Sequence, residues 1–250
     1  MTNTKPGPSS STASRPFECW RVARAVCVGI SLGLVCLSPA GAGDIREHQQ
    51  LVDRAKLTFD RFQSDAKLAS WFRTEAKNMK AIFIVPQLLR GALGVGVSGG
   101  SGVLLARDFV KGGWSPPAFY RMSAGSVGFQ VGADASEVLL VINTFAGLER
   151  FYGGGAFKLG LESGVSVGSI GEGGTAGLDV VSFASSKGAF LGMSLAGFAI
   201  SALSDANETY YGTAVKPEQI LANGPITNAG ADELRAAVSR ANRFRERNVE

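Results

Sequence analysis

Apolar residues follow a helical spacing over residues 45–80, a segment that contains neither glycine nor proline. They recur at steps of three and four, with charged and amide side chains between them: Leu51, Ala55, Phe59, Phe62, Ala66 and Ala69. The pattern predicts two helices, roughly 45–64 and 66–79. Ser64-Asp65 is the predicted break and the predicted cap of the second helix.

After residue 80 the chain changes to short runs of β-branched and aromatic residues separated by glycine. These runs predict strands at 81–86, 92–107, 118–132, 136–144, 156–169, 178–185 and 188–203. Helical spacing returns only between Ala231 and Arg245, where Asn228 or Asp232 can cap the helix. We therefore expect an α+β fold: a largely antiparallel, strongly twisted sheet or partial barrel, with N-terminal helices and a C-terminal helix.

The first 42 residues differ in character from the rest. A polar lead-in precedes Arg21 and Arg24, an uncharged run follows from Ala25 to Leu37, and small residues end the segment at Ala42. This order is typical of a secretory signal peptide, and it predicts cleavage after Ala42 with residues 43–250 as a single domain. The apolar run is shorter than the roughly 20 residues that a membrane span needs. An uncleaved anchor is the alternative, because the lead-in is long.

Composition narrows the possible functions. All three cysteines lie in the leader, so residues 43–250 have no thiol for a disulfide or a thiolate metal site. Four of the 25 basic residues and one of the 21 acidic residues also lie there. The sequence pI near 9.1 is therefore mostly a property of the leader. It gives no support to a nucleic-acid partner, and a single histidine gives none to a metal site or a cofactor.

Two glycine motifs suggest chemistry that the rest of the chain does not support. Gly94-x-Gly96-x-x-Gly99 has dinucleotide-loop spacing, but that loop must open a helix, and Gly102 follows too soon. Ser98 and Ser166 each stand in a G-x-S-x-G pattern. A serine nucleophile needs a base, and the one histidine, His48, lies far upstream of both. We expect no catalytic residue, no enzyme activity, and a glycine-rich β-hairpin over residues 90–104.

Several blocks of the chain occur in the order of a known domain. They are KAIFIVP at 80–86, RGALGVG at 90–96, GVL at 102–104, WSxPxF at 114–119, SVGFQVGA at 126–133, EVLLV at 137–141, SKGAFxG at 186–192 and NxxYYG at 207–212. Over residues 45–250 the chain resembles the SYLF domain family. The resemblance implies a lipid-binding domain rather than an enzyme. Relatives bind phosphoinositide membranes, partly through an N-terminal amphipathic helix, and some bind actin.

The predicted export changes which partners we expect. The chain is similar to an exported, bacterial version of the domain, located in the periplasm or cell envelope and peripheral at the membrane. Actin is doubtful as a partner for an exported protein. We expect a non-enzymatic lipid-binding protein that acts at a membrane surface through anionic phospholipid headgroups. The alternative is an envelope scaffold or protein-interaction module without lipid binding.

A membrane-binding surface needs cations for headgroups and apolar side chains for the interface. The candidate residues near the second helix supply both kinds: Lys67, Trp71, Phe72, Lys77 and Lys80. The alternative is that both aromatic rings pack on the sheet and the lysines are ordinary solvated charges.

A faint internal repeat adds two further candidates. Arg90 and Lys187 stand at equivalent positions in the repeat and could flank one headgroup site. The alternative is that they are two hairpin-end charges. The block from Asn207 to Gly212 is predicted to be structural, with its amide and a tyrosine hydroxyl satisfying backbone groups at a turn.

Overall fold

A computed structural model describes residues 40–75, 78–110, 112–160, 164–169, 177–186, 189–191, 193–222 and 224–243. All of them belong to one compact unit, Ser38–Glu250. The predicted leader, up to residue 39, lies outside the described residues, so its cleavage stays a prediction. Within the described part of the chain, no helix is both long enough and apolar enough to cross a membrane.

Two N-terminal helices precede the sheet, as the apolar spacing predicts. Helix α1 spans Ala40–Ser64 and helix α2 spans Ala66–Glu75. Asp65 caps α2, because its carboxylate accepts hydrogen bonds from the backbone N–H groups of Lys67 and Leu68, both at 3.0 Å. The predicted break and cap are confirmed, and α2 ends four residues earlier than expected.

The sheet is built on two long strands, β1 (Ala81–Ala106) and β2 (Ala118–Ile142). They pair antiparallel from Ala81↔Ile142 to Leu104↔Ala118. The shorter strands are β3 (Phe157–Lys158), β4 (Val167–Ser169), β5 (Val180–Ser186), β6 (Ala189–Leu191) and β7 (Ala199–Ala202). The described sheet is seven-stranded with the order β3-β7-β2-β5-β4, and only β4 and β5 pair parallel.

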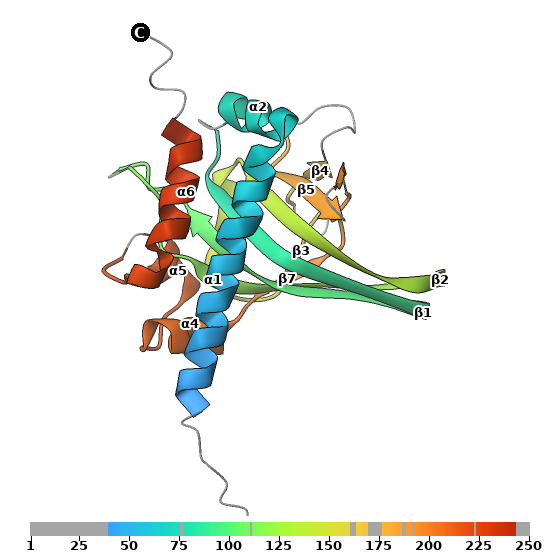
Figure 1. Cartoon of the computed structure of the whole chain (residues 1–250), viewed down its shortest axis with the longest axis horizontal. Helices are drawn as coiled ribbons and strands as arrows, with labels where there is room; N and C mark the ends of the chain where they lie inside the picture. Colours follow the sequence, from blue (N-terminus) through green and yellow to red (C-terminus); the bar gives the residue numbers. More distant parts are fainter. Residues whose placement is uncertain are drawn as a thin grey trace, which may run out of the picture. The chain divides into compact units, whose positions relative to one another are not determined.

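One stretch of β1 and β2 forms a ribbon that carries no other strand. β7 pairs with residues 120–123 of β2, and β5 pairs with residues 137–142 on the same edge. The middle of β2 therefore has β1 as its described pairing partner, and the two strands extend away from the helices together (Figure 1). We call this segment, residues 88–99 and 124–136, the β1–β2 ribbon.

Strand β1 bends back on itself. A Cβ on Gly100 would lie 2.4 Å from the carbonyl oxygen of Gln87, and one on Gly102 would lie 2.3 Å from that of Ile84. Only glycine permits this approach between the two halves of the strand. The expected hairpin over residues 90–104 is therefore wrong: the segment is part of one continuous, bent strand paired with β2.

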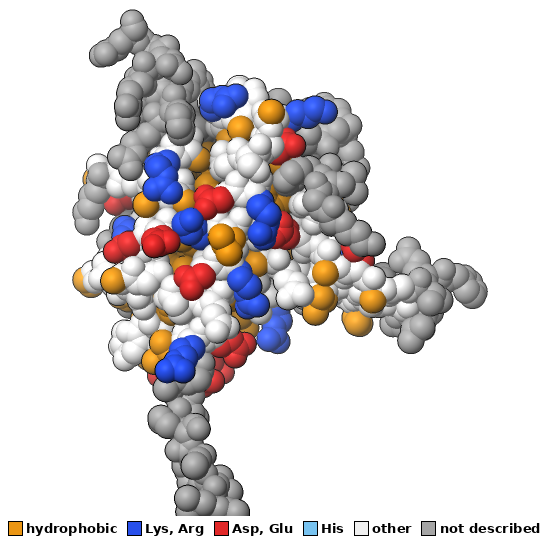
Figure 2. Space-filling view, viewed as in Figure 1, with side chains coloured by type: hydrophobic (Ala, Val, Ile, Leu, Met, Phe, Trp, Pro, Cys, Tyr) orange, Lys and Arg blue, Asp and Glu red, His pale blue; other side chains and the backbone are white. Residues whose placement is uncertain are grey.

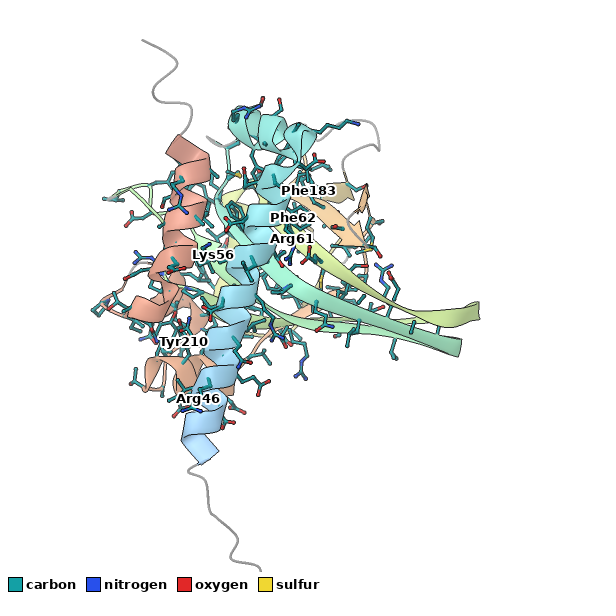
Figure 3. All side chains as sticks on the ribbon, in the orientation of Figure 1. Arg46, Lys56, Arg61, Phe62, Phe183 and Tyr210 are labelled. Atoms are coloured by element: carbon teal, nitrogen blue, oxygen red, sulfur yellow. The ribbon has the colours of Figure 1, made fainter. Side chains whose placement is uncertain are left out.

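Helices cover both faces of the sheet, and an apolar core cluster lies on each face. On one face lie α1, α2, α4 (Ser204–Tyr211) and α6 (Asp232–Arg243), with Phe62 of α1 and Phe183 of β5 in one core cluster (Figure 3). On the other face, α3 (Phe145–Tyr152) and α5 (Pro217–Leu221) cover a second cluster that includes Phe83 and Leu140. Figure 1 shows α1 and α6 side by side on the first face. The α+β architecture, with its mostly antiparallel sheet, is confirmed.

The short helices α3, α4 and α5 correct the expectation that helical spacing returns only at Ala231. Each has eight residues or fewer, so each presents too few turns for an apolar period to stand out. The C-terminal helix is confirmed as α6. Asn228 caps the preceding 3-10 turn Ala229–Ala231, because its side chain accepts a hydrogen bond from the N–H of Gly230.

The Asn207–Gly212 block has the structural role predicted for it. The buried Asn207 amide accepts from the N–H of Phe119 at 2.8 Å and donates to the carbonyl of the same residue at 3.3 Å. The Tyr211 hydroxyl donates to the Pro117 carbonyl at 2.6 Å. Gly212 ends α4 with a φ of 68°, which favours glycine. The block fastens α4 to the start of β2.

Candidate functional site

Lys80 lies where three chain segments meet at one end of the sheet. Its N–H donates to the carbonyl of Ile142 at 2.7 Å, and its carbonyl accepts from the N–H of Arg107 at 2.8 Å. The backbone of Lys80 is thus fixed between the end of β2 and the end of β1. Its side chain projects from this anchored position.

Two phenylalanine rings surround the Lys80 ammonium. Nζ lies 4.4 Å from the ring centre of Phe109 and 4.8 Å from that of Phe145, and the two rings meet edge to face at 5.6 Å. The guanidinium carbon of Arg107 lies 5.2 Å from the Phe109 ring centre. Distances of this size allow cation–π attraction.

The same group of residues leaves a large apolar area in water. Phe109 is 46% exposed, Phe145 is 62% exposed and Val110 is 94% exposed. We call Lys80, Arg107, Phe109, Val110 and Phe145 the Lys80 patch. Single exposed apolar residues are common, but two exposed rings beside a cation, with exposed Val110 next to one of them in the chain, are a reason to expect an interaction surface.

The local sequence explains why Phe109 and Phe145 are held outward. Asp108 accepts from the N–H of Val110 at 2.8 Å, and glycine 113, at a φ of 93°, closes the turn by accepting from Asp108 N–H at 3.0 Å. Phe145 is the first residue of α3, whose N-cap Thr144 accepts from the N–H of Gly147 at 3.1 Å. A turn and a helix start therefore fix the two rings.

Electrostatics at the Lys80 patch favour an anionic partner. Burial lowers the pKa of the Lys80 ammonium from its ordinary value, and the nearby Arg107 charge lowers it further. Burial leaves the positive charge less well solvated than in open water, and repulsion by Arg107 adds to the cost of the charge. An incoming anion would offset this cost.

The predicted site residues of α2 divide between surface and core. Lys67 is exposed, whereas Phe72 is only 1% exposed and belongs to the core that α1 and the sheet share. Trp71 is half-buried, with its ring 4.8 Å from Phe183 and 5.4 Å from Phe72. Phe72 thus takes the core position that was the alternative to membrane contact, and Trp71 packs at the edge of that core. Lys77 lies outside the described residues.

Arg90 lies elsewhere, on the β1–β2 ribbon. Ten residues of strand separate it from Lys80, which corresponds to about 30 Å along an extended chain. Its guanidinium is half-buried beside the thioether sulfur of Met193. Lys187, its predicted partner, lies outside the described residues. The structure therefore does not bring Arg90 and Lys80 into one site.

Two cations of α1, Lys56 and Arg61, are paired with carboxylates. Lys56 pairs with Asp60 at 2.8 Å, and Arg61 forms an ion pair with Glu137 of β2. Figure 3 labels Arg46, Lys56 and Arg61 along this helix, and Figure 2 shows basic and acidic side chains interspersed on the same face. In the part of that face that the structure describes, there is no broad basic surface.

Comparison with known protein families matches part of the chain to one family. Residues 123–241 match the Ysc84 family, described as "Las17-binding protein actin regulator". These residues form a Ysc84 domain. The resemblance to SYLF domains is thereby confirmed over this range, and the family is described as a regulator of actin rather than as an enzyme.

Fungal and animal proteins are among the relatives of this chain. It is similar to LAS seventeen-binding protein 3 of Saccharomyces cerevisiae, at 31% identity over 181 residues, which cover 69% of this chain and 39% of the relative. It is also similar to the human SH3 domain-containing YSC84-like protein 1, at 30% identity over 161 residues, covering 62% and 46%. The chain thus spans less than half the length of these relatives.

Four residues of the Lys80 patch lie before the family match, and Phe145 lies within it. Lys80 was predicted from the sequence, but Arg107, Phe109, Val110 and Phe145 were not. Asp108-Phe109-Val110, two apolar residues in a loop that leads into a glycine pair, was the available signal. Exposed apolar residues in a turn are a reason to suspect a contact surface.

The two serines in G-x-S-x-G patterns, Ser98 before the family match and Ser166 within it, have structural surroundings. Ser98 lies on the β1–β2 ribbon opposite Ala124. The Ser166 hydroxyl donates to the Asp179 carboxylate at 2.8 Å and accepts from the Asp179 N–H at 2.9 Å. Ser166 therefore links the start of β4 to the start of β5.

His48 packs on the Phe119 ring at 5.4 Å, on the helix-covered face.

Ser166→Ala is expected to lower the free energy of unfolding by about 1.5–3 kcal/mol, the range for a hydrogen bond to a charged group. Burial alone would raise the pKa of Asp179, but hydrogen bonds from Thr144 and Ser166 outweigh it and lower that pKa. Ser98→Ala is the matched control and should change stability by less than about 0.5 kcal/mol. Urea unfolding measures both. Equal stability of the two variants would contradict the structural role of Ser166.

Proposed function

We propose that the chain is a non-enzymatic lipid-binding protein that acts at a membrane surface through anionic phospholipid headgroups. The observation that carries the proposal is the Lys80 patch, where two exposed phenylalanine rings lie against the Lys80 ammonium and Val110, next to Phe109 in the chain, is exposed as well. A peripheral membrane protein needs this combination, because apolar groups enter the interface while cations meet headgroup phosphates.

The magnitudes favour the apolar part of the patch as the larger contribution. Each fully buried Val or Phe side chain contributes about 1.5–3 kcal/mol, and roughly half of that is still available where the side chain is about half exposed. Each Lys or Arg near an anionic surface contributes about 1 kcal/mol. Lys67 of α2 is a further exposed cation, 13 positions before Lys80 in the chain.

The direct test is co-sedimentation of the 250-residue chain with vesicles. We expect binding to vesicles that contain phosphatidylglycerol and markedly less to pure phosphatidylcholine. Raising the salt concentration should weaken the headgroup part of the binding, because exposed charges are screened beyond about 8 Å at physiological ionic strength. Absence of binding to both kinds of vesicle would contradict the proposal.

We further propose an exported location in the periplasm or cell envelope, supported by the leader sequence. The expected first residue after cleavage, Gly43, falls within the first turn of α1, and the first buried α1 side chain described is Leu51. Cleavage would therefore leave the core contacts of α1 in place.

N-terminal sequencing of the protein from a fractionated producing cell tests this location. We expect Gly43 as the first residue of envelope-associated material, because the apolar run and the small residues before it have signal-peptide order. Intact Met1 on cytoplasmic material would contradict export and would restore actin as an accessible partner.

A protein partner is the second candidate, favoured by the description of the Ysc84 family as Las17-binding and actin-regulating. In that case the Lys80 patch, or another face, would contact a protein rather than a bilayer. Co-sedimentation with actin filaments in the absence of lipid separates the two candidates. Actin binding without vesicle binding would favour the second.

A further inference from the structure

A trough of about 780 Å³ lies on the β1–β2 ribbon, beside residues 193–198. Among the residues that the structure describes there, Arg90 and Asp134 are charged, and Val97, Met193 and Phe198 are the larger apolar ones. Most of its remaining described lining is glycine, alanine and serine. The volume lies within the range of about 300–1,000 Å³ that small-molecule sites occupy.

Arg90 is poorly satisfied in this trough. Its Nε is buried and has no hydrogen-bond partner, and the guanidinium contact recorded for it is the Met193 thioether, a weak acceptor. Buried guanidinium groups normally meet oxygen acceptors, and an unmet buried donor is costly. An oxygen-rich anionic group in the trough would supply the missing acceptor.

Asp134 provides a negative charge next to Arg90. The two residues are register partners on β1 and β2, so their side chains share one face of the ribbon. Hydrogen bonds from Ser186 and Ser136 lower the pKa of Asp134, which keeps its carboxylate ionised. A simple anion would be repelled by Asp134 and a simple cation by Arg90.

Gly132 keeps this face of the trough open. It pairs with Ala92 two positions from Arg90 and Asp134, and therefore lies on their face. A Cβ at Gly132 would meet nothing within 4 Å, and its φ is not positive. Glycine in a strand interior is destabilising. Neither packing nor backbone conformation requires it here, in contrast to Gly100 and Gly102.

We propose that the trough binds one single-chain zwitterionic amphiphile, with a phosphate on Arg90, an ammonium on Asp134 and the chain against Val97, Met193 and Phe198. Lysophosphatidylethanolamine has this chemistry, since two carbons separate its phosphate oxygen from its ammonium. The trough and the Lys80 patch involve different residues. Failure of this proposal would therefore leave the proposed membrane-surface function untouched, and the reverse also holds.

Isothermal titration calorimetry of the full chain tests the proposal with three probes, each below its micelle concentration. The probes are lysophosphatidylethanolamine, lysophosphatidic acid, which lacks the ammonium, and phosphoethanolamine, which lacks the chain. We expect the first to bind at least roughly tenfold more tightly than either of the others, a difference of about 1.4 kcal/mol. Equal or tighter binding of either other probe would overturn the proposal.

Variants assign the binding to the trough. Arg90→Gln and Gly132→Val should each weaken lysophosphatidylethanolamine at least roughly tenfold. Gly132→Val should keep or raise the melting temperature, because valine suits a strand and its Cβ meets open space. Gly155→Val is the matched control, also with no atom within 4 Å of its Cβ but outside the trough. Unchanged affinity in folded Gly132→Val would overturn the proposal even if Arg90→Gln does not fold.

Discussion

Phe72→Ala is expected to lower the free energy of unfolding by about 3–5 kcal/mol, the range for truncating a buried phenylalanine. The side chain is 1% exposed, and its ring lies 6.0 Å from that of Phe59, 5.4 Å from Trp71 and 5.8 Å from Phe183. Truncation would leave a cavity among aromatic rings that come from both helices and from β5. Such a cavity collapses poorly, so most of the lost packing energy is not recovered.

Urea unfolding followed by circular dichroism measures this change. Lys67→Ala on the same helix is the control, because its exposed side chain should alter stability by less than about 0.5 kcal/mol. If Phe72→Ala instead kept wild-type stability and weakened vesicle binding, Phe72 would be a membrane contact and its core position would be contradicted.

The helical part of the fold could be predicted where the apolar spacing runs over several turns. Helices α1 and α2 follow from that spacing, and Asp65 caps α2 as its position suggests. Helix α4 could not be found this way, because it has only eight residues. Its place is set by Asn207, whose two hydrogen bonds join it to Phe119, a residue 88 positions away.

Strand boundaries were harder to predict because glycine has two different uses in this chain. Glycine was taken as the end of one strand and the start of the next. At Gly100 and Gly102 it instead allows the two halves of β1 to approach each other. The break predicted between strands 81–86 and 92–107 falls elsewhere, at residues 87–91 with Gly91, where the structure has one continuous strand. Local patterns do not reveal contacts between residues that only the bend brings together.

The sequence predicted the chemistry of the candidate site, a cation beside apolar side chains, but it identified only Lys80 among the residues that form it. Lys80 was expected to contact headgroups, and it lies in the patch. Its aromatic neighbours Phe109 and Phe145 are 36 positions apart in the chain. They meet because the bend in β1 brings its two ends together: the Lys80 backbone is hydrogen-bonded to Ile142 at the end of β2 and to Arg107 just after the end of β1. That meeting depends on strand register, which a single sequence does not determine.

The central claim is that the Lys80 patch inserts into an anionic membrane surface. Replacing Phe109, Val110 and Phe145 together by serine should weaken vesicle binding by about 3 kcal/mol, since each loses roughly 1 kcal/mol of apolar burial. This is a decrease of more than roughly 100-fold in affinity. Lys80→Gln should weaken binding by about 1 kcal/mol, and added salt should mimic only that variant, because apolar burial is not screened.

The matched control is the double variant Ile45→Ser with Leu57→Ser. These two residues of α1 are 48% and 53% exposed, similar to Phe109 at 46%, but they lie on another surface. Thermal melts of every variant confirm that the fold is kept. The deciding measurement is co-sedimentation of the triple variant and the α1 control with phosphatidylglycerol-containing vesicles at two salt concentrations. We expect the triple variant to lose binding at both concentrations while the control keeps it; wild-type binding by the triple variant would show that the Lys80 patch does not contact the membrane.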